Sequence, residues 1–212
     1  MRPDWPVATA LGALAGAALV PVLTSHGLIQ LARQDRANVR LRLISTLAGG
    51  LVGAAVVATS YRHDACGRAP ALLIWGSCLA AVASCDAVTQ RIPTPLTRLA
   101  TVTTSLLLVV GLSWATDWRG LVLSAVGSVA AGLTMLLCWR FAGAGFGDVR
   151  LATLGGLGLA HATPGSLTLG LVAMVAVLAT QAGVALARGG SRTTMLPYGP
   201  ALAVGFVVAA LH

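Results

Sequence analysis

The chain has 212 residues, of which 57% are hydrophobic and 9% are charged, and its mean hydropathy is +0.85. Because a soluble domain has about 25% charged residues, this composition excludes an ordinary soluble protein and indicates a chain embedded in lipid. The net charge of +8 does not indicate a nucleic-acid partner, since the arginines lie in short gaps between apolar segments and form no cluster on a soluble face.

Apolar segments follow one another along the chain, each close to the roughly 20 residues that a helix needs to cross the hydrocarbon core. They predict an all-α integral membrane protein, a polytopic bundle of about eight transmembrane helices. We expect a single membrane-embedded domain over residues 1–212, with a core from about 70–212 preceded by two helices at 7–24 and 43–60. The predicted segments are Val7–Thr24, Leu43–Ser60, Pro70–Ala87, Thr97–Trp114, Leu121–Trp139, Asp148–Ala162, Ser166–Ala187 and Leu196–Leu211.

The first two segments carry glycine pairs with a spacing of four, Gly12/Gly16 and Gly49/Gly53. Small residues at this spacing let helix backbones approach closely in a membrane. Ordinary helix packing is a sufficient interpretation of both pairs.

The third segment ends at Asp86, after which the chain passes through Arg91 to Ile92 and Pro93. A proline at this point stops a helix. Asp86 is therefore predicted just inside a membrane boundary.

The sixth segment starts at Asp148, directly after a glycine-rich turn that contains Gly143, Gly145 and Gly147. Without a Cβ atom these glycines permit a backbone or a substrate strand to come close, although a flexible loop is an equally good interpretation. The segment itself is short and rich in glycine, so we expect it to be tilted, partly unwound or shielded from lipid.

The arginines predict the orientation, because basic residues favour cytoplasmic loops. With the N-terminus outside, ten arginines fall in cytoplasmic gaps and four in outer gaps, and both Asp86 and Asp148 fall on the cytoplasmic side. The ten are Arg33, Arg36, Arg40, Arg42, Arg91, Arg98, Arg140, Arg150, Arg188 and Arg192, and the four are Arg2, Arg62, Arg68 and Arg119.

Asp86 and Asp148 are thus predicted at one membrane depth, where a charged group is expensive and function is the default hypothesis. Each has a structural alternative: Asp148 could cap a helix N-terminus, and Asp86 could pair with Arg91 or Arg98. As a pair in a desolvated site they would share one proton, the state in which an aspartate pair activates water. The cysteines and histidines form no ligand set, so we assign no metal and no cofactor.

Three stretches resemble the type IV prepilin peptidase family, membrane aspartyl proteases of the GxGD kind. Residues 86–93, DAVTQRIP, are similar to the block with the first catalytic Asp, and residues 145–151, GFGDVRL, resemble the more specific GxGD block with the second. Residues 196–203, LPYGPALA, are similar to a block in the family's last helix. The resemblance implies catalytic roles for Asp86 and Asp148, with an active-site surround of Pro93, Gly145, Gly147, Arg150, Pro197, Gly199 and Pro200.

Two positions depart from the family's pattern: Arg150 stands in place of the usual Lys, and Thr94 where Asn or Asp is common. Larger members carry a cysteine-ligated zinc domain, associated with N-methylation, between the first two helices. Here that loop, 25–42, has no cysteine. The resemblance therefore implies the short form of the family, an aspartic endopeptidase without N-methyltransferase activity.

The implied function is removal of the leader from a prepilin or pseudopilin at the cytoplasmic face of the bacterial inner membrane. A transporter or channel that uses Asp86 and Asp148 as proton or cation sites is the alternative from another class. The Gly-x-Gly-Asp turn joined to the Pro-Tyr-Gly-Pro block favours the peptidase, since a proton relay has no evident need for either. The sequence leaves open whether the peptidase substrate is instead an archaellin-like protein or a signal-peptide remnant.

Overall fold

The computed structural model describes residues 5–32, 38–62, 66–189 and 196–212, and these residues form helices and turns without a strand. The expected all-helical membrane bundle is confirmed. A short 3₁₀ turn, η2 (Cys66–Arg68), precedes the third helix. The eight α-helices are α1 (Trp5–Gln30), α2 (Val39–Arg62), α3 (Ala69–Thr89), α4 (Thr94–Trp114), α5 (Trp118–Ala142), α6 (Phe146–Leu157), α7 (Pro164–Ala187) and α8 (Tyr198–Leu211).

Within the described residues, six helices are long and apolar enough to cross a membrane, and α6 and α8 are shorter. The sixth segment begins at Phe146 instead of Asp148 and ends at Leu157 instead of Ala162. It ends early because the amide of Gly158 donates to the carbonyl of Gly155, a 3₁₀-type bond that tightens the last turn. α6 has 12 residues, most of them buried against other helices, so the expected shielding from lipid is present.

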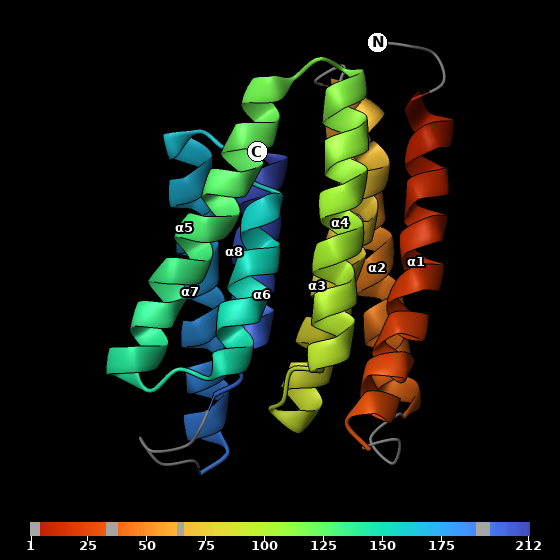
Figure 1. The fold of residues 1–212 in the computed structure, drawn as a ribbon. Coiled ribbons are helices and arrows are strands. Elements are labelled where there is room, and N and C mark those ends of the chain that lie inside the picture. The colour runs from red at the N-terminus through yellow and green to blue at the C-terminus, as the bar shows by residue number, and fades with distance from the viewer. Residues whose placement is uncertain (1–4, 33–37, 63–65, 190–195) are drawn as a thin grey trace.

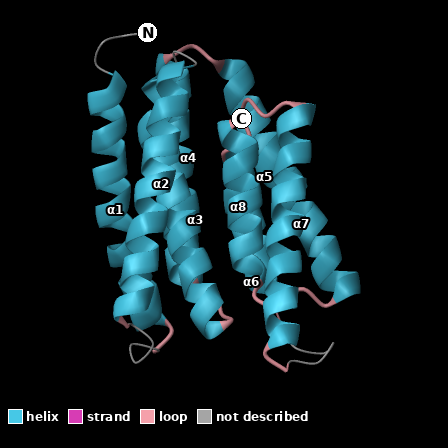
Figure 2. Ribbon diagram, turned by 180° about the vertical axis from the view of Figure 1, so that it is seen from behind, coloured by secondary structure: helices cyan, strands magenta, loops and turns pink. Residues whose placement is uncertain are grey.

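The helices run antiparallel in two groups, α1–α4 and α5–α8, which stand side by side (Figure 1). The view from behind shows the same division, with α3 and α8 near the middle of the molecule (Figure 2). The C-terminal ends of α1, α3, α5 and α7 and the N-terminal ends of α2, α4, α6 and α8 lie at one end of the bundle. We call this the aspartate end, because it holds Asp86 and Asp148, and the other the distal end.

The predicted glycine pairs do bring the first two helices together. A Cβ atom added to Gly16 would overlap the carbonyl oxygen of Gly49, and one added to Gly53 would overlap that of Gly12. Only glycine allows α1 and α2 to pack at this separation, so the small-residue spacing has a structural role.

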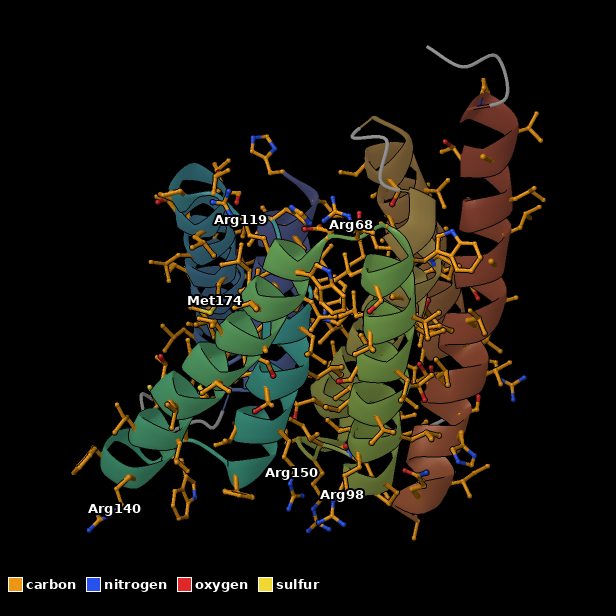
Figure 3. The ribbon with its side chains drawn as sticks, turned by 45° about the horizontal axis from the view of Figure 1, so that its top comes forward. Arg68, Arg98, Arg119, Arg140, Arg150 and Met174 are labelled. Atoms are coloured by element: carbon orange, nitrogen blue, oxygen red, sulfur yellow. The ribbon has the colours of Figure 1, made fainter. Side chains whose placement is uncertain are left out.

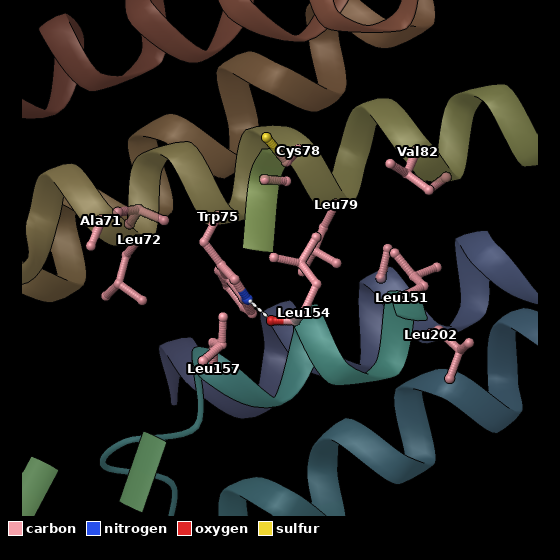
Figure 4. Close-up of a cluster of buried hydrophobic side chains, with 14 of the residues drawn as sticks. Ala71, Leu72, Trp75, Cys78, Leu79, Val82, Leu151, Leu154, Leu157 and Leu202 are labelled. Atoms are coloured by element: carbon pink, nitrogen blue, oxygen red, sulfur yellow. Dashed lines mark hydrogen bonds between the residues drawn. The ribbon is translucent and has the colours of Figure 1, made fainter. Parts of the chain in front are cut away.

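The core lies where the two groups meet. Trp75 of α3 is fully buried and donates its indole N–H to the carbonyl oxygen of Leu154 in α6, at 2.8 Å (Figure 4). The apolar side chains around it come from α2, α3, α4, α6 and α8. By contrast, α5 and α7 expose leucine and valine side chains along their length, as expected of helices that face lipid. The buried contact between α3 and α6 holds the two catalytic candidates on adjoining elements.

Candidate active site

Asp86 lies in the last turn of α3 and is 5% exposed. Its Oδ2 accepts a hydrogen bond from the backbone N–H of Gly199 at 2.8 Å. Gly199 is in the first turn of α8, after Pro197 at the N-cap, and backbone N–H groups at a helix N-terminus are free to bind an anion. A Cβ atom on Gly199 would lie 2.7 Å from that carboxylate oxygen. Glycine is therefore required for this contact.

Asp148 is the third residue of α6 and is 7% exposed. Its Oδ2 accepts from the backbone N–H of Gly145, the N-cap residue, at 3.1 Å. The structural alternative for Asp148 is thus realised in part: its carboxylate caps α6, but from the third helical position, because the helix starts earlier than the sequence predicts. A capping carboxylate is also favoured by the helix dipole.

The two carboxylates are close enough for the charge of Asp148 to act on Asp86. Each uses one oxygen to accept a backbone N–H bond, and within the described residues the second oxygen of each has no hydrogen-bond partner. The alternative in which Asp86 pairs with Arg91 or Arg98 is wrong in this structure, because both arginines are exposed and, among the described residues, neither forms an ion pair with it. Buried acidic groups without a cationic partner call for a functional explanation.

The beginning of α6 packs against the turn between α3 and α4. A Cβ atom on Gly147 would lie 3.0 Å from Cβ of Ile92, so the glycine lets α6 approach this turn closely. Nη1 of Arg150 donates to the hydroxyl of Thr94 at 2.6 Å. The guanidinium of Arg150 also lies 4.9 Å from the ring centre of Phe146. These contacts join the two stretches that contain the aspartates.

Arg150 and Thr94 are the two positions at which the chain departs from the prepilin peptidase pattern, and they contact each other. Because the guanidinium is a planar group with several donors, it can reach a hydroxyl while stacking on an aromatic ring. The two departures thus belong to one interaction.

Prolines begin two of the helices at this end. Pro93 is buried at the N-cap of α4, with its ψ in the extended region at 105°, and Pro197 has the same role for α8. Pro200 lies in the first turn of α8, beside an apolar groove described below. All nine residues singled out from the sequence therefore lie at the aspartate end, at the ends of α3, α4, α6 and α8.

Two apolar grooves lie at the aspartate end, and both are lined by sequence neighbours of site residues. One, of about 360 Å³, lies between α2, α3 and α8 and includes Ala87, the neighbour of Asp86. The other, of about 410 Å³, lies among α5–α8 and includes Ala144 and Tyr198, which are next to Gly145 and Gly199. Apolar polypeptide could therefore reach the site from either group of helices.

Two residues that help to position the site could not be identified from the sequence. Ile92 appeared in a motif, but its contact with Gly147 did not follow from its position. Gln30, at the end of α1, accepts a hydrogen bond from the N–H of Leu96 at 3.1 Å and so caps α4 from a distant part of the chain. A polar residue at the end of an apolar helix was the available signal for Gln30.

Comparison of the chain with protein-family models, with curated proteins and with solved structures finds no match.

Proposed function

We propose that the protein is an intramembrane aspartyl endopeptidase of the prepilin peptidase type, with Asp86 and Asp148 as the catalytic residues. The single observation that carries the proposal is the meeting of three separate sequence motifs at one end of the bundle. Their contacts are Gly199 with Asp86, Gly147 with Ile92, and Arg150 with Thr94.

The chemistry needs one ionised and one protonated carboxyl group. The ionised aspartate takes a proton from water while the water oxygen attacks the peptide carbonyl carbon, and the protonated aspartate donates a hydrogen bond to the carbonyl oxygen. When the C–N bond breaks, the departing nitrogen receives a proton, and hydrolysis leaves an acid and an amine. The backbone N–H groups of Gly145 and Gly199 hold one oxygen of each carboxylate, which leaves the other oxygen for water or substrate.

The proposed substrate is a prepilin or pseudopilin whose leader is removed at the cytoplasmic face of a bacterial inner membrane. The apolar grooves at the aspartate end favour a substrate with a hydrophobic segment near its cleavage site. The described arginines support the orientation, since seven lie at the aspartate end and three at the distal end. The seven are Arg40, Arg42, Arg91, Arg98, Arg140, Arg150 and Arg188, and the three are Arg62, Arg68 and Arg119. Arg2, Arg33, Arg36 and Arg192 lie outside the described residues.

Co-expression with a candidate prepilin from the same genome tests the catalytic pair. We expect Asp86→Asn and Asp148→Asn each to reduce leader removal by at least about 100-fold, because each abolishes a proton-transfer group. Asp117→Asn is the matched control, since Asp117 caps α5 at the distal end, and it should cleave like the wild type. Undiminished cleavage by either active-site variant would contradict the proposal.

A separate experiment tests the proposal that the enzyme has no methyltransferase activity. Mass spectrometry of a pilin processed by this enzyme alone should show a trimmed, unmethylated N-terminus. A methylated product would overturn this part of the proposal and leave the peptidase part intact.

Labelling of single cysteines tests the orientation. Arg91→Cys at the aspartate end and Ala115→Cys at the distal end replace exposed residues. In a background without other cysteines, an impermeant maleimide applied to intact cells should label Cys at 115 only. Labelling of the other site alone would reverse the orientation.

A further inference from the structure

A cavity of about 550 Å³ lies at the distal end, away from the two aspartates. Its walls come from both groups of helices: η2 and the end of α4 on one side, and the α6–α7 connection and the end of α8 on the other. Side chains of three kinds line it, a cation, a histidine–aspartate pair and an apolar surface: Arg68, Leu112, Asp117, His161, Ala210 and Leu211. The proposed peptidase reaction uses none of them.

Arg68 brings a half-buried cation to this cavity. Its Nε atom is buried and, among the described residues, has no hydrogen-bond partner. Burial lowers the pKa of Arg68, and the charge of Asp117 opposes that change, but a guanidinium stays protonated at neutral pH. Figure 3 places Arg68 and Arg119 at the end of the molecule opposite Arg98 and Arg150. A half-buried guanidinium whose Nε has no partner among the described residues is a candidate for binding an anion.

Asp117 is already engaged with other groups. Its Oδ1 accepts from the N–H of Gly120 at 2.8 Å, and its Oδ2 lies 2.9 Å from Nε2 of His161. Burial and the charge of Arg68 hold the pKa of His161 below its usual value, against the opposite effect of Asp117. The neutral form of His161 is therefore favoured, with its Nε2 within hydrogen-bond distance of Asp117. Arg119 also acts on His161 from outside the lining, and the described lining itself holds one arginine and one aspartate.

Part of the remaining lining is apolar and belongs to the ends of two helices, and the remainder includes two threonines and a second histidine. Leu112 of α4 faces the cavity, as do Ala210 and Leu211 of α8. Arg68 directly precedes the apolar span of α3, which starts at Ala69, so its guanidinium lies near the boundary where lipid headgroups meet the hydrocarbon core. An anion with an attached hydrocarbon chain would match both parts of the lining.

We propose that this cavity binds the phosphate group of an anionic phospholipid, with Arg68 as the phosphate-binding residue and the ends of α4 and α8 in contact with the hydrocarbon. The fork of N–H donors on a guanidinium matches two phosphate oxygens, which a lysine ammonium cannot reproduce. This inference is independent of the proposed peptidase function.

Native mass spectrometry of the full-length protein from phosphatidylglycerol nanodiscs tests the proposal. The wild type should retain a bound phosphatidylglycerol, and Arg68→Gln should reduce its occupancy at least about fivefold. Arg68→Lys should give an intermediate occupancy. Arg98→Gln is the matched control, because it removes one exposed arginine at the aspartate end and should leave occupancy unchanged.

A second variant leaves the arginine in place and fills the cavity. Ala115 is exposed and lines the cavity at the end of α4, so Ala115→Phe should displace the lipid without removing a charge. Equal lipid occupancy in the wild type, Arg68→Gln and Ala115→Phe would overturn the proposal. So would displacement of the lipid by millimolar inorganic phosphate, since that result would assign the site to a soluble anion.

Discussion

The two ends of the bundle hold acidic groups in opposite ways. At the aspartate end, Asp86 and Asp148 are buried, lack cationic partners among the described residues and accept bonds from backbone N–H groups. At the distal end, Asp117 is partly exposed and contacts a histidine, with arginines nearby. The same antiparallel helices produce both arrangements.

The difference shows that close backbone packing can position a carboxylate by a hydrogen bond from the main chain. Gly199 places a peptide N–H on Asp86 only because no Cβ atom intervenes. Such a donor belongs to the main chain, so its position is fixed by the helix and costs no side-chain entropy. At the distal end Asp117 also accepts a backbone N–H, from Gly120, but longer side chains around a cavity surround it, which suits binding more than positioning for chemistry.

The largest effect is expected when the close approach at the aspartate end is broken. In Gly199→Ala the new Cβ atom would lie 2.7 Å from Oδ2 of Asp86, so α8 must move and the N–H bond is lost. Misplacement by about 1 Å can lower a rate by about 100-fold. We expect a loss of that size in leader removal, measured with membrane-embedded enzyme.

Gly183→Ala provides the control for that substitution. Gly183 lies within α7 and is exposed, and an added Cβ atom would meet nothing within 4 Å. Cleavage should be unchanged, and the free energy of unfolding should rise by up to about 1 kcal/mol through helix propensity. If Gly199→Ala cleaved as well as Gly183→Ala, the backbone contact with Asp86 would have no role in activity.

The next effect concerns the link between the two groups of helices. Trp75→Phe removes the donor that binds the carbonyl oxygen of Leu154 and leaves a buried acceptor unpaired, which destabilises by about 1–3 kcal/mol. Thermal unfolding in detergent measures the change. Trp114→Phe, at a side chain 90% exposed, should stay within about 0.5 kcal/mol of the wild type. Similar losses in both variants would show that the buried hydrogen bond does not hold the groups together.

A smaller effect is expected at the pair that departs from the family's pattern. Thr94→Val and Arg150→Lys should each lower cleavage by roughly threefold to tenfold, because each disturbs the bond between the two aspartate-bearing stretches. In a double-mutant cycle the two changes should be coupled by about 0.5–3 kcal/mol. Independent, additive effects on the rate would mean that the contact between Arg150 and Thr94 does not help to hold the two aspartate-bearing stretches in place.

The sequence predicted the helices, their approximate ends and the common location of Asp86 and Asp148. Lipid requires long apolar segments, and the arginines in the loops indicate which loops lie on the same side of the membrane. The glycine pairs of α1 and α2 were predictable for the same reason. What could not be predicted depends on distant residues. The bond from Trp75 to Leu154 spans 79 positions, and no periodic pattern encodes such a pairing.

The distal cluster shows the same limit. Arg68, Asp117 and His161 come from three separate connections, and in the sequence the arginine indicated only topology and the histidine no site. Their meeting depends on how the ends of four helices align. A metal-type ligand spacing or a local motif would have been visible, but a cavity assembled from single residues is not.

The smallest effect is a pH dependence at the distal end. Burial and the charge of Arg68 hold the pKa of His161 below the 6.5 of an ordinary histidine, although Asp117 and Arg119 also face it, with opposite effects. The unfolded chain therefore binds this proton at a higher pH than the folded protein does. Its contribution to stability is fully present above about pH 6.5 and is lost as the pH falls through the folded-state pKa.

Thermal unfolding at about pH 7.5 and at about pH 5.5, on either side of the ordinary histidine pKa, measures this contribution. His161→Gln keeps an N–H donor toward Asp117 but cannot take up a proton, so its unfolding midpoint should fall less on acidification than that of the wild type. His26→Gln, at an exposed position near the aspartate end, should keep the wild-type difference. Identical pH responses of all three proteins would show that burial and Arg68 do not hold His161 in its neutral form. The contrast between the two ends would then rest only on the positions of their hydrogen-bonding groups.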